Sequence, residues 1–282
     1  MTLLFTNARL IDPEAGTDSI GAVLVQNGRI AAVEKNDTNP DQLFRTRNIG
    51  AEDVTLVDCG GKCLAPGIVD IGVKVCEPGE RHKESYKSAG LAAAAGGVTT
   101  MITRPDTTPA IDSPETLEFV TRRAQADAPV NVLAMAALTK GREGREMTEI
   151  GFLMDAGAVA FTDCDHVVAD TKVFSRALTY ARSCGALVIA HPQEPGLSKG
   201  AAATAGKFAA LRGLPSVTPM AERMGLDRDI ALLEMTGAKY HADQITTARA
   251  LPALERAKAN GLDITAGTSI HHLTLNELDV AD

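Results

Sequence analysis

From residue 68 onward the chain repeats one pattern: a short apolar run, a loop, and a segment of helical composition. Seven apolar runs are typical of strands, and they cover 68–75, 98–102, 130–136, 159–161, 186–190, 238–241 and 263–266. Helices are predicted between them, over 85–95, 113–126, 149–156, 170–184, 220–236 and 246–260. Parallel strands need crossover connections, which are usually helices, so the alternation predicts an α/β fold with a parallel sheet and helices outside it.

Local signals support these boundaries. Ser113 followed by Pro114 is typical of a helix N-terminus, and Gly185 is typical of a helix C-terminus. The first apolar run, 68–75, is rich in β-branched residues and is expected to be a buried strand.

Residues 1–63 lack this alternation and predict a small β domain without a helix, so the chain divides into 1–63 and 64–282. Its clearest signal is a hairpin over 22–33, in which Asn27-Gly28 forms the two-residue turn. A short strand is predicted at 54–58, and the polar segment 35–52 is predicted to be a surface loop.

Composition limits the classes of function. Apolar residues make up 45% of the 282 residues, which supports a sizeable core, and the net charge of -8 argues against a nucleic-acid or anionic membrane surface. No apolar run reaches transmembrane length, and the first residues lack the pattern of a signal peptide. Five scattered cysteines are typical of reduced thiols, so a cytoplasmic protein is expected.

Several motifs together carry a resemblance that extends over nearly the whole chain. They are Leu64–Asp70, Glu77-Pro78-Gly79, Ala93–Thr100, Ala160–Asp163 and Arg212–Pro215. With these motifs the chain resembles the cyclic amidohydrolases, and most closely the dihydroorotases. The resemblance implies a (β/α)8 barrel whose last strand lies beyond the end of this chain, beside an N-terminal β-sandwich domain. The alternative from strand counting alone is a seven-stranded or open doubly wound sheet.

The same resemblance shows what the first two strands lack. In the family the first strand ends in His-x-His followed two residues later by Arg, and these positions are Gly72, Lys74 and Cys76 here. The second strand ends in Met-Pro-Asn-Thr in dihydroorotases, and Asp106 replaces the asparagine that contacts substrate. Gly72 has no donor, and the Lys74 ammonium is a poor metal ligand whose expected role is electrostatic. No residue is therefore assigned as catalytic.

Three further positions match family metal ligands: Asp163, His191 and His241. Asp163 matches one branch of the family, although Cys164 follows it where that branch often has a second aspartate. Each of the three also has an ordinary interpretation, as an acidic loop residue or a hydrogen-bonded histidine. Three donors are the minimum for a catalytic zinc, so the expected cofactor is none or at most one zinc.

The losses fall together at one site, and they favour a dihydroorotase-like protein of pyrimidine biosynthesis without catalysis. The resemblance implies a structural or regulatory subunit that partners aspartate carbamoyltransferase in a homo- or hetero-oligomer. One alternative is an active metal-dependent cyclic amidohydrolase of dihydroorotase, hydantoinase or allantoinase type, with Asp163, His191 and His241 on one metal. Another is a module that only binds a small ligand in this site.

Overall fold

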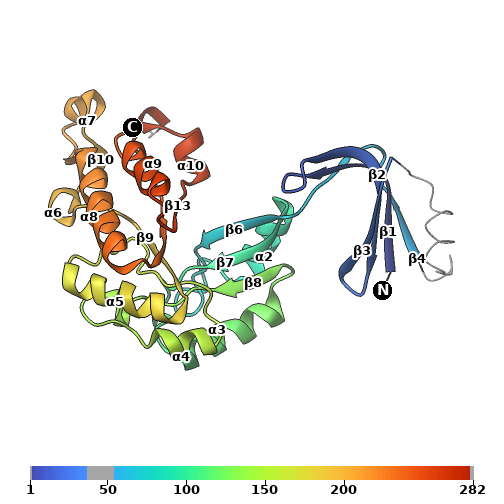
Figure 1. The fold of residues 1–282 in the computed structure, drawn as a ribbon, viewed down its shortest axis with the longest axis horizontal. Helices are drawn as coiled ribbons and strands as arrows, with labels where there is room; N and C mark the ends of the chain where they lie inside the picture. Colours follow the sequence, from blue (N-terminus) through green and yellow to red (C-terminus); the bar gives the residue numbers. More distant parts are fainter. Residues whose placement is uncertain (1, 37–53, 280–282) are drawn as a thin grey trace. The chain divides into compact units, whose positions relative to one another are not determined.

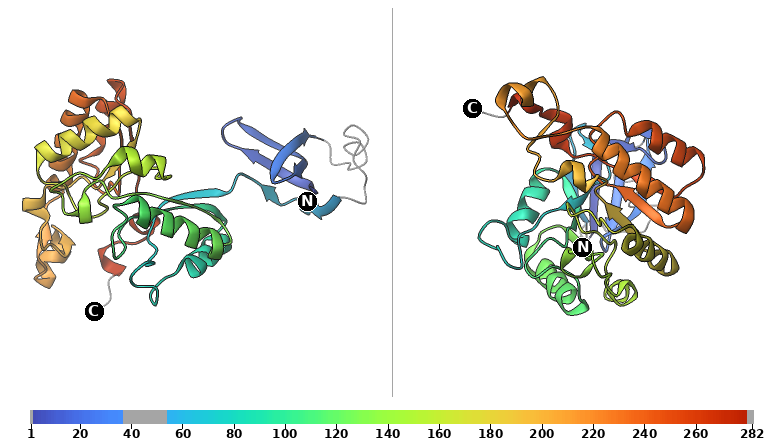
Figure 2. Two further views of the ribbon diagram at one scale, coloured as in Figure 1. Left: turned by 90° about the horizontal axis from the view of Figure 1, so that it is seen from below. Right: turned by 90° about the vertical axis from the view of Figure 1, so that its left-hand side faces the viewer.

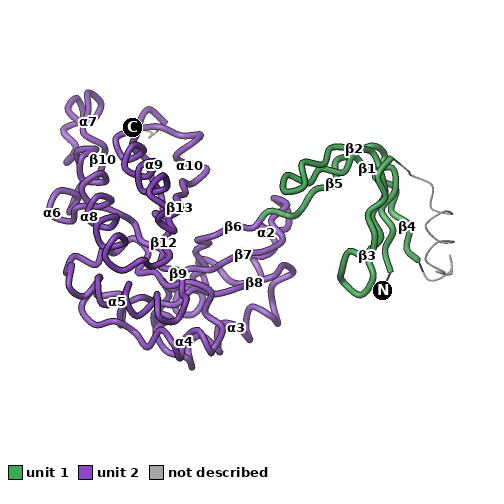
Figure 3. Tube along the Cα trace, viewed as in Figure 1, with its two compact units in different colours: residues 1–68 green, residues 69–282 purple. Residues whose placement is uncertain are grey.

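The computed structural model describes residues 2–36 and 54–279, which divide into two compact units, 1–68 and 69–282 (Figure 3). The sequence prediction placed the division between residues 63 and 64. The predicted loop at 35–52 lies outside the described residues from residue 37 onward.

The described part of the first unit is a single sheet. Its strands are β1 (Thr2–Asp12), β2 (Thr17–Gln26), β3 (Arg29–Lys35), β4 (Val54–Asp58) and β5 (Cys63–Leu64). The order is β3-β2-β1-β4, and β5 also pairs with β1. The predicted hairpin is confirmed: β2 and β3 pair antiparallel, and Asn27 and Gly28 between them both have positive φ, as a two-residue hairpin turn requires.

One face of this sheet carries an apolar groove. It is lined by apolar side chains from four strands and the chain that follows them, including Phe5, Leu10, Val23, Ile30 and Leu64. Ile30 is 69% exposed, although β-branched side chains on a sheet normally pack against a second layer. The described residues of this unit form one sheet, and the predicted sandwich stays a prediction.

The described part of the second unit contains seven strand segments that correspond to the seven predicted strands. They include the sheet β6 (Ile68–Val73), β7 (Val98–Thr103) and β8 (Asn131–Ala134), and the sheet β9 (Leu187–Ala190), β12 (Lys239–Ala242) and β13 (Ile264–Ala266). Phe161 joins the two sheets, because it forms parallel bridges with Ala136 and Val188. The predicted strand at 159–161 is therefore present as this short bridging segment. A separate two-stranded sheet, β10 (Ala203–Thr204) and β11 (Ser216–Val217), was not predicted.

Helices lie outside these strands (Figures 1 and 2). They are α2 (Tyr86–Ala95), α3 (Pro114–Asp127), α4 (Ile150–Asp155), α5 (Thr171–Cys184), α6 (Pro195–Ser198), α7 (Lys207–Arg212), α8 (Met220–Thr236), α9 (Leu251–Ala259) and α10 (Ile270–Thr274), with short 3-10 turns at Lys140–Arg142 and Glu277–Asp279. Ser113 caps α3 through the Thr116 amide, and Gly185 ends α5 with φ +71°. The predicted helix at 246–260 is shorter at its start, because the Glu222 carboxylate binds the amides of Thr246 and Thr247 in a loop.

The main core fills the layer between strands and helices, with Tyr86, Met101, Leu117 and Phe161 among its fully buried side chains. A second, smaller cluster of Met135, Ala160 and Ile189 lies on the other face of the strands. Neighbouring side chains on β7, on β9 and at residues 160–161 fall into different clusters, as the two-residue period of a strand requires.

The first strand of this unit differs from the prediction. The segment 68–75 was expected to be buried, but Ile68, Val69 and Ile71 are each about half exposed. The physical reason is its position: β6 is an edge strand, with β7 as its only neighbour among the described residues. β13 is the other edge of this seven-segment arrangement, so both outer edges lack a partner within the described ranges.

Candidate functional site

The carboxyl ends of parallel strands meet at one edge of a sheet, and the predicted site residues lie at such ends. Gly72 lies in β6 and has φ +97°, and Lys74 follows that strand directly. Asp106, Asp163 and His191 lie in the loops after β7, the Phe161 segment and β9, and His241 lies in β12. Strand topology therefore puts all of them at one end of the second unit.

Two of the altered positions contact each other. Lys74 Nζ lies 3.1 Å from Asp106 Oδ2, and Arg104 Nη2 lies 3.4 Å from the same oxygen. The Asp106 side chain is 3% exposed, whereas that of Lys74 is 58% exposed. The residues that replace a metal ligand and a substrate contact in the resemblance thus form an ion pair across β6 and β7.

The ion pair continues into a chain of alternating charges. Arg104 Nη2 also lies 3.4 Å from Asp165 Oδ1, and Arg142 Nη1 lies 3.5 Å from that oxygen. Both arginine side chains are mostly buried. Arg104 and Asp165 were not predicted as site residues, although a charged residue directly after a strand is a signal for one.

Both carboxylate oxygens of Asp163 accept hydrogen bonds from protein groups. Its Oδ1 accepts hydrogen bonds from the Leu138 and Thr139 amides at 3.0 and 2.9 Å, and its Oδ2 accepts one from the Thr139 hydroxyl at 2.5 Å. Burial raises the pKa of Asp163, and these hydrogen bonds oppose that rise because they stabilise the carboxylate. Asp163 therefore holds the loop after β8 in place.

The two predicted histidines line different cavities. His191 shares one with Asp163 and His166, and its Nδ1 lies 3.4 Å from the Asp243 carbonyl oxygen. His241 lines the other, its Nδ1 lies 2.8 Å from Thr265 Oγ1, and its Nε2 is buried without a hydrogen-bond partner. Burial lowers the pKa of His241, and the negative charge of Asp243 opposes this shift without cancelling it.

These contacts bear on the zinc that the resemblance implies. Gly72 offers no donor, the Lys74 ammonium is paired, and both Asp163 oxygens accept protein hydrogen bonds. Across residues 2–36 and 54–279, no three His, Cys, Asp or Glu side chains are grouped to hold a metal ion. The described donor set does not fit a catalytic zinc, which needs at least three protein ligands.

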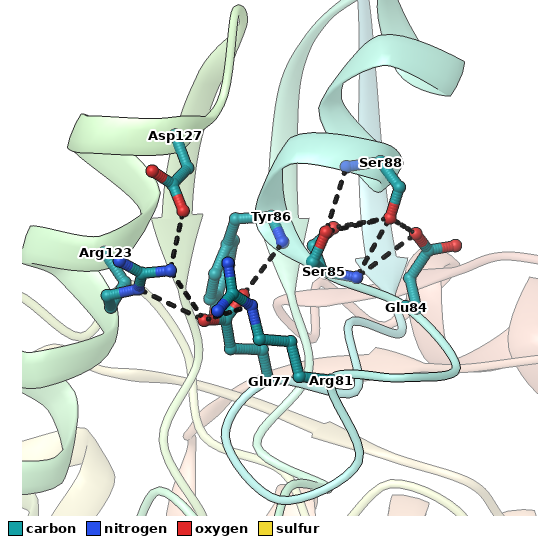
Figure 4. A network of polar contacts seen from close by, with 8 residues as sticks. All are labelled: Glu77, Arg81, Glu84, Ser85, Tyr86, Ser88, Arg123 and Asp127. Carbon is teal, nitrogen blue, oxygen red and sulfur yellow. Dashed lines mark hydrogen bonds and ion pairs between the residues drawn. The ribbon is translucent and has the colours of Figure 1, made fainter.

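The loop after β6, which carries the half-buried Cys76, is anchored by a second polar network (Figure 4). Oε1 of the buried Glu77 accepts a hydrogen bond from Arg123 Nε at 3.1 Å. The same oxygen forms ion pairs with Arg123 Nη2 at 3.1 Å and with Arg81 Nε at 3.4 Å. Its other oxygen accepts the Tyr86 amide at the start of α2. Glu77 thus joins this loop to α2 and α3.

Comparisons with known proteins agree on one family. The family described as Dihydro-orotase-like matches residues 61–250. A dihydroorotase from Syntrophobacter fumaroxidans is 36% identical over 97% of this chain and 61% of its own length. A dihydroorotase from Bacillus cytotoxicus is 37% identical over 99% of this chain and 62% of its own. A dihydroorotase-like protein from Pseudomonas putida is 35% identical over 99% of this chain and 63% of its own.

The chain spans about three fifths of the length of these relatives. Among solved structures, an L-hydantoinase from Arthrobacter aurescens superposes with a TM-score of 0.78 at 19% identity, over 98% of this chain and 60% of that one. A D-hydantoinase from a Thermus species gives 0.73 at 22% identity, over 98% and 59%. At these identities the structures show the α/β amidohydrolase fold alone. No helix among the described residues is long and apolar enough to cross a membrane.

Proposed function

The chain belongs to the dihydroorotase-like family, and we propose that it is a non-catalytic member, a structural or regulatory subunit that partners aspartate carbamoyltransferase in pyrimidine biosynthesis. Hydrolysis of a cyclic amide needs a metal to lower the pKa of water, a base, and a charged grip on the substrate. This chain keeps the fold of the family, and we propose that it lacks these three catalytic elements.

The Lys74–Asp106 ion pair carries the proposal. A lysine ammonium has no free electron pair for a metal, and this one contacts a carboxylate instead. The same contact occupies the carboxylate that stands in place of a substrate-binding amide. The residues that replace a metal ligand and a substrate contact are therefore engaged with each other. This supports a site without zinc chemistry.

Exposed apolar side chains support a role in assembly. Ile270, Leu273, Leu275 and Leu278 follow one another along the last described segment and are each more than half exposed. Exposed apolar side chains that gather into one patch are typical of interaction sites. Aspartate carbamoyltransferase as the partner rests on the family resemblance.

The test is a turnover assay with dihydroorotate and with carbamoyl aspartate, beside a zinc measurement on the same preparation. We expect no turnover, no binuclear zinc centre and at most one zinc per chain. Co-expression with the aspartate carbamoyltransferase of the same organism should yield a complex that elutes together on size exclusion. Substantial turnover, or no association with that enzyme, would contradict the corresponding half of the proposal.

The second candidate is a hydrolase with a single metal. The observation that favours it is the buried, unpartnered Nε2 of His241, because an imidazole nitrogen without a hydrogen bond is available to a metal. Stoichiometric zinc that is lost in His241→Asn, together with cleavage of a hydantoin or another cyclic amide, would support it over the first.

A further inference from the structure

Residues 195–217, here called the basic segment, carry positive charges only. They include α6, α7 and the two-stranded sheet of β10 and β11, and their charged residues are Lys199, Lys207 and Arg212. Such a segment stands out in a chain whose net charge is -8. Three of its leucines are exposed: Leu197 by 45%, Leu211 by 77% and Leu214 by 37%. The basic segment therefore presents apolar side chains beside positive charge.

Residues 270–279, here called the acidic segment, have the opposite charge. Glu277 and Asp279 are its charged residues when its two histidines are neutral. Every residue of this segment is exposed, and its leucines are exposed by 70%, 56% and 77% at Leu273, Leu275 and Leu278. The acidic segment therefore presents apolar side chains beside negative charge.

Both segments lie on the same side of the second unit. The red end of the ribbon lies on the side of α7 in each view of Figures 1 and 2. A surface with two apolar halves of opposite charge is complementary to itself. A two-fold rotation brings the basic half of one copy against the acidic half of the other, and it makes this contact twice.

The leucines and the charges contribute differently to such a contact. Burial of apolar surface is the main favourable term in association, and exposed apolar side chains gathered on one face are typical of interaction sites. Opposite charges determine which orientation of the two copies is favourable, because like charges placed together repel. The two-fold arrangement buries leucines from both segments and pairs opposite charges at once.

We propose that a second copy of this chain docks on this surface, with the basic segment of each copy against the acidic segment of the other. The dimer goes beyond the proposed function, since it requires neither the loss of catalysis nor the carbamoyltransferase partner. Its charged contacts are exposed, so the dimer should weaken as the salt concentration rises.

The experiment is analytical ultracentrifugation of the full chain at low and at high salt, with two charge reversals on exposed side chains. Lys207→Glu and Glu277→Lys each place like charges across both contacts, and each variant alone should dimerise about tenfold or more weakly at low salt. An equimolar mixture of the two variants should dimerise as the unmodified chain does. In the mixed pair one contact is native and the other has its two charges exchanged.

Lys87→Glu is the matched control, because Lys87 is exposed on α2, outside both segments, and its reversal changes the net charge as Lys207→Glu does. It should weaken dimerisation less than twofold. A monomeric unmodified chain overturns the proposal, and so does a mixture that associates no better than either variant alone. Self-association through the open edges of β6 and β13 would be insensitive to both reversals, which also overturns it. So does loss of carbamoyltransferase binding in Glu277→Lys while self-association stays unchanged.

Discussion

Lys74 Nζ and Asp106 Oδ2 lie 3.1 Å apart, and the two partners differ sharply in burial. Removing the exposed partner leaves a buried carboxylate that keeps only Arg104, whereas removing the buried partner leaves an ammonium that water can solvate. Replacing Lys74 should therefore lower the free energy of unfolding more than replacing Asp106.

The first prediction follows from this asymmetry. Lys74→Met should lower the free energy of unfolding by about 1–2 kcal/mol, and Asp106→Asn by less, because an unpaired buried charge is the costly product. Urea unfolding of both variants and of the double variant measures the coupling. Lys83→Met, in an exposed pair with Glu80, is the control and should cost less than Lys74→Met, because exposed ion pairs contribute little to stability. Equal losses in Lys74→Met and Lys83→Met would contradict the prediction.

Restoring the two histidines should not restore dihydroorotase activity. In the variant Gly72→His with Lys74→His, Cys76 and Asp106 still lack the substrate contacts that the resemblance implies. Gly72 also has φ +97°, where a residue with a Cβ is strained, although no neighbouring atom blocks the space. Turnover and zinc content of this double variant are the measurements, and activity above the unmodified chain would show that the lost imidazoles alone explain inactivity.

Glu77 should matter for stability more than an ordinary surface acid. Glu77→Gln removes the buried charge that Arg123 and Arg81 contact, while Arg123 keeps its 2.7 Å ion pair with Asp127. We expect a loss of about 1–3 kcal/mol in the free energy of unfolding. Glu118→Gln, in an exposed helical pair with Arg122, should change it by less than about 0.5 kcal/mol. Similar losses from the two substitutions would rule out the anchoring role of Glu77.

His241 should make stability depend on pH. Burial lowers its pKa below the ordinary value of 6.5, against the charge of Asp243. The unfolded chain then binds more protons between the two pKa values, so the free energy of unfolding falls as pH drops below about 6.5. His241→Asn should flatten this dependence below about pH 6.5. Urea titrations at several pH values test it, and parallel curves for the two proteins would refute it.

The open edges of β6 and β13 should limit the stability of residues 1–282 alone. Unpaired edges invite association, and the half-exposed Ile68, Val69 and Ile71 lie on one of them. We expect a low unfolding temperature and self-association, relieved when a longer chain or a partner covers these edges. Thermal unfolding and size exclusion are the measurements. A clean monomer with a cooperative transition at high temperature would show that seven strands suffice.

The local elements and their order could be predicted from short-range sequence signals. Apolar runs, the Ser113 cap and the Asn27-Gly28 turn depend on neighbours a few residues away, so they could be recognised directly, and the family motifs identified the same fold. Positions at strand ends were also predictable, because parallel strands end at one edge.

Which of those side chains contact one another depends on how distant segments pack. Lys74 and Asp106 become partners because β6 and β7 are adjacent, and Asp163 is engaged by Leu138 and Thr139 from another strand end. Burial was likewise beyond the sequence: the β-branched run at 68–75 has the composition of a buried strand, but exposure depends on what packs against it. An ion pair, an occupied carboxylate and an open edge are all contacts between distant segments, and no local pattern encodes them.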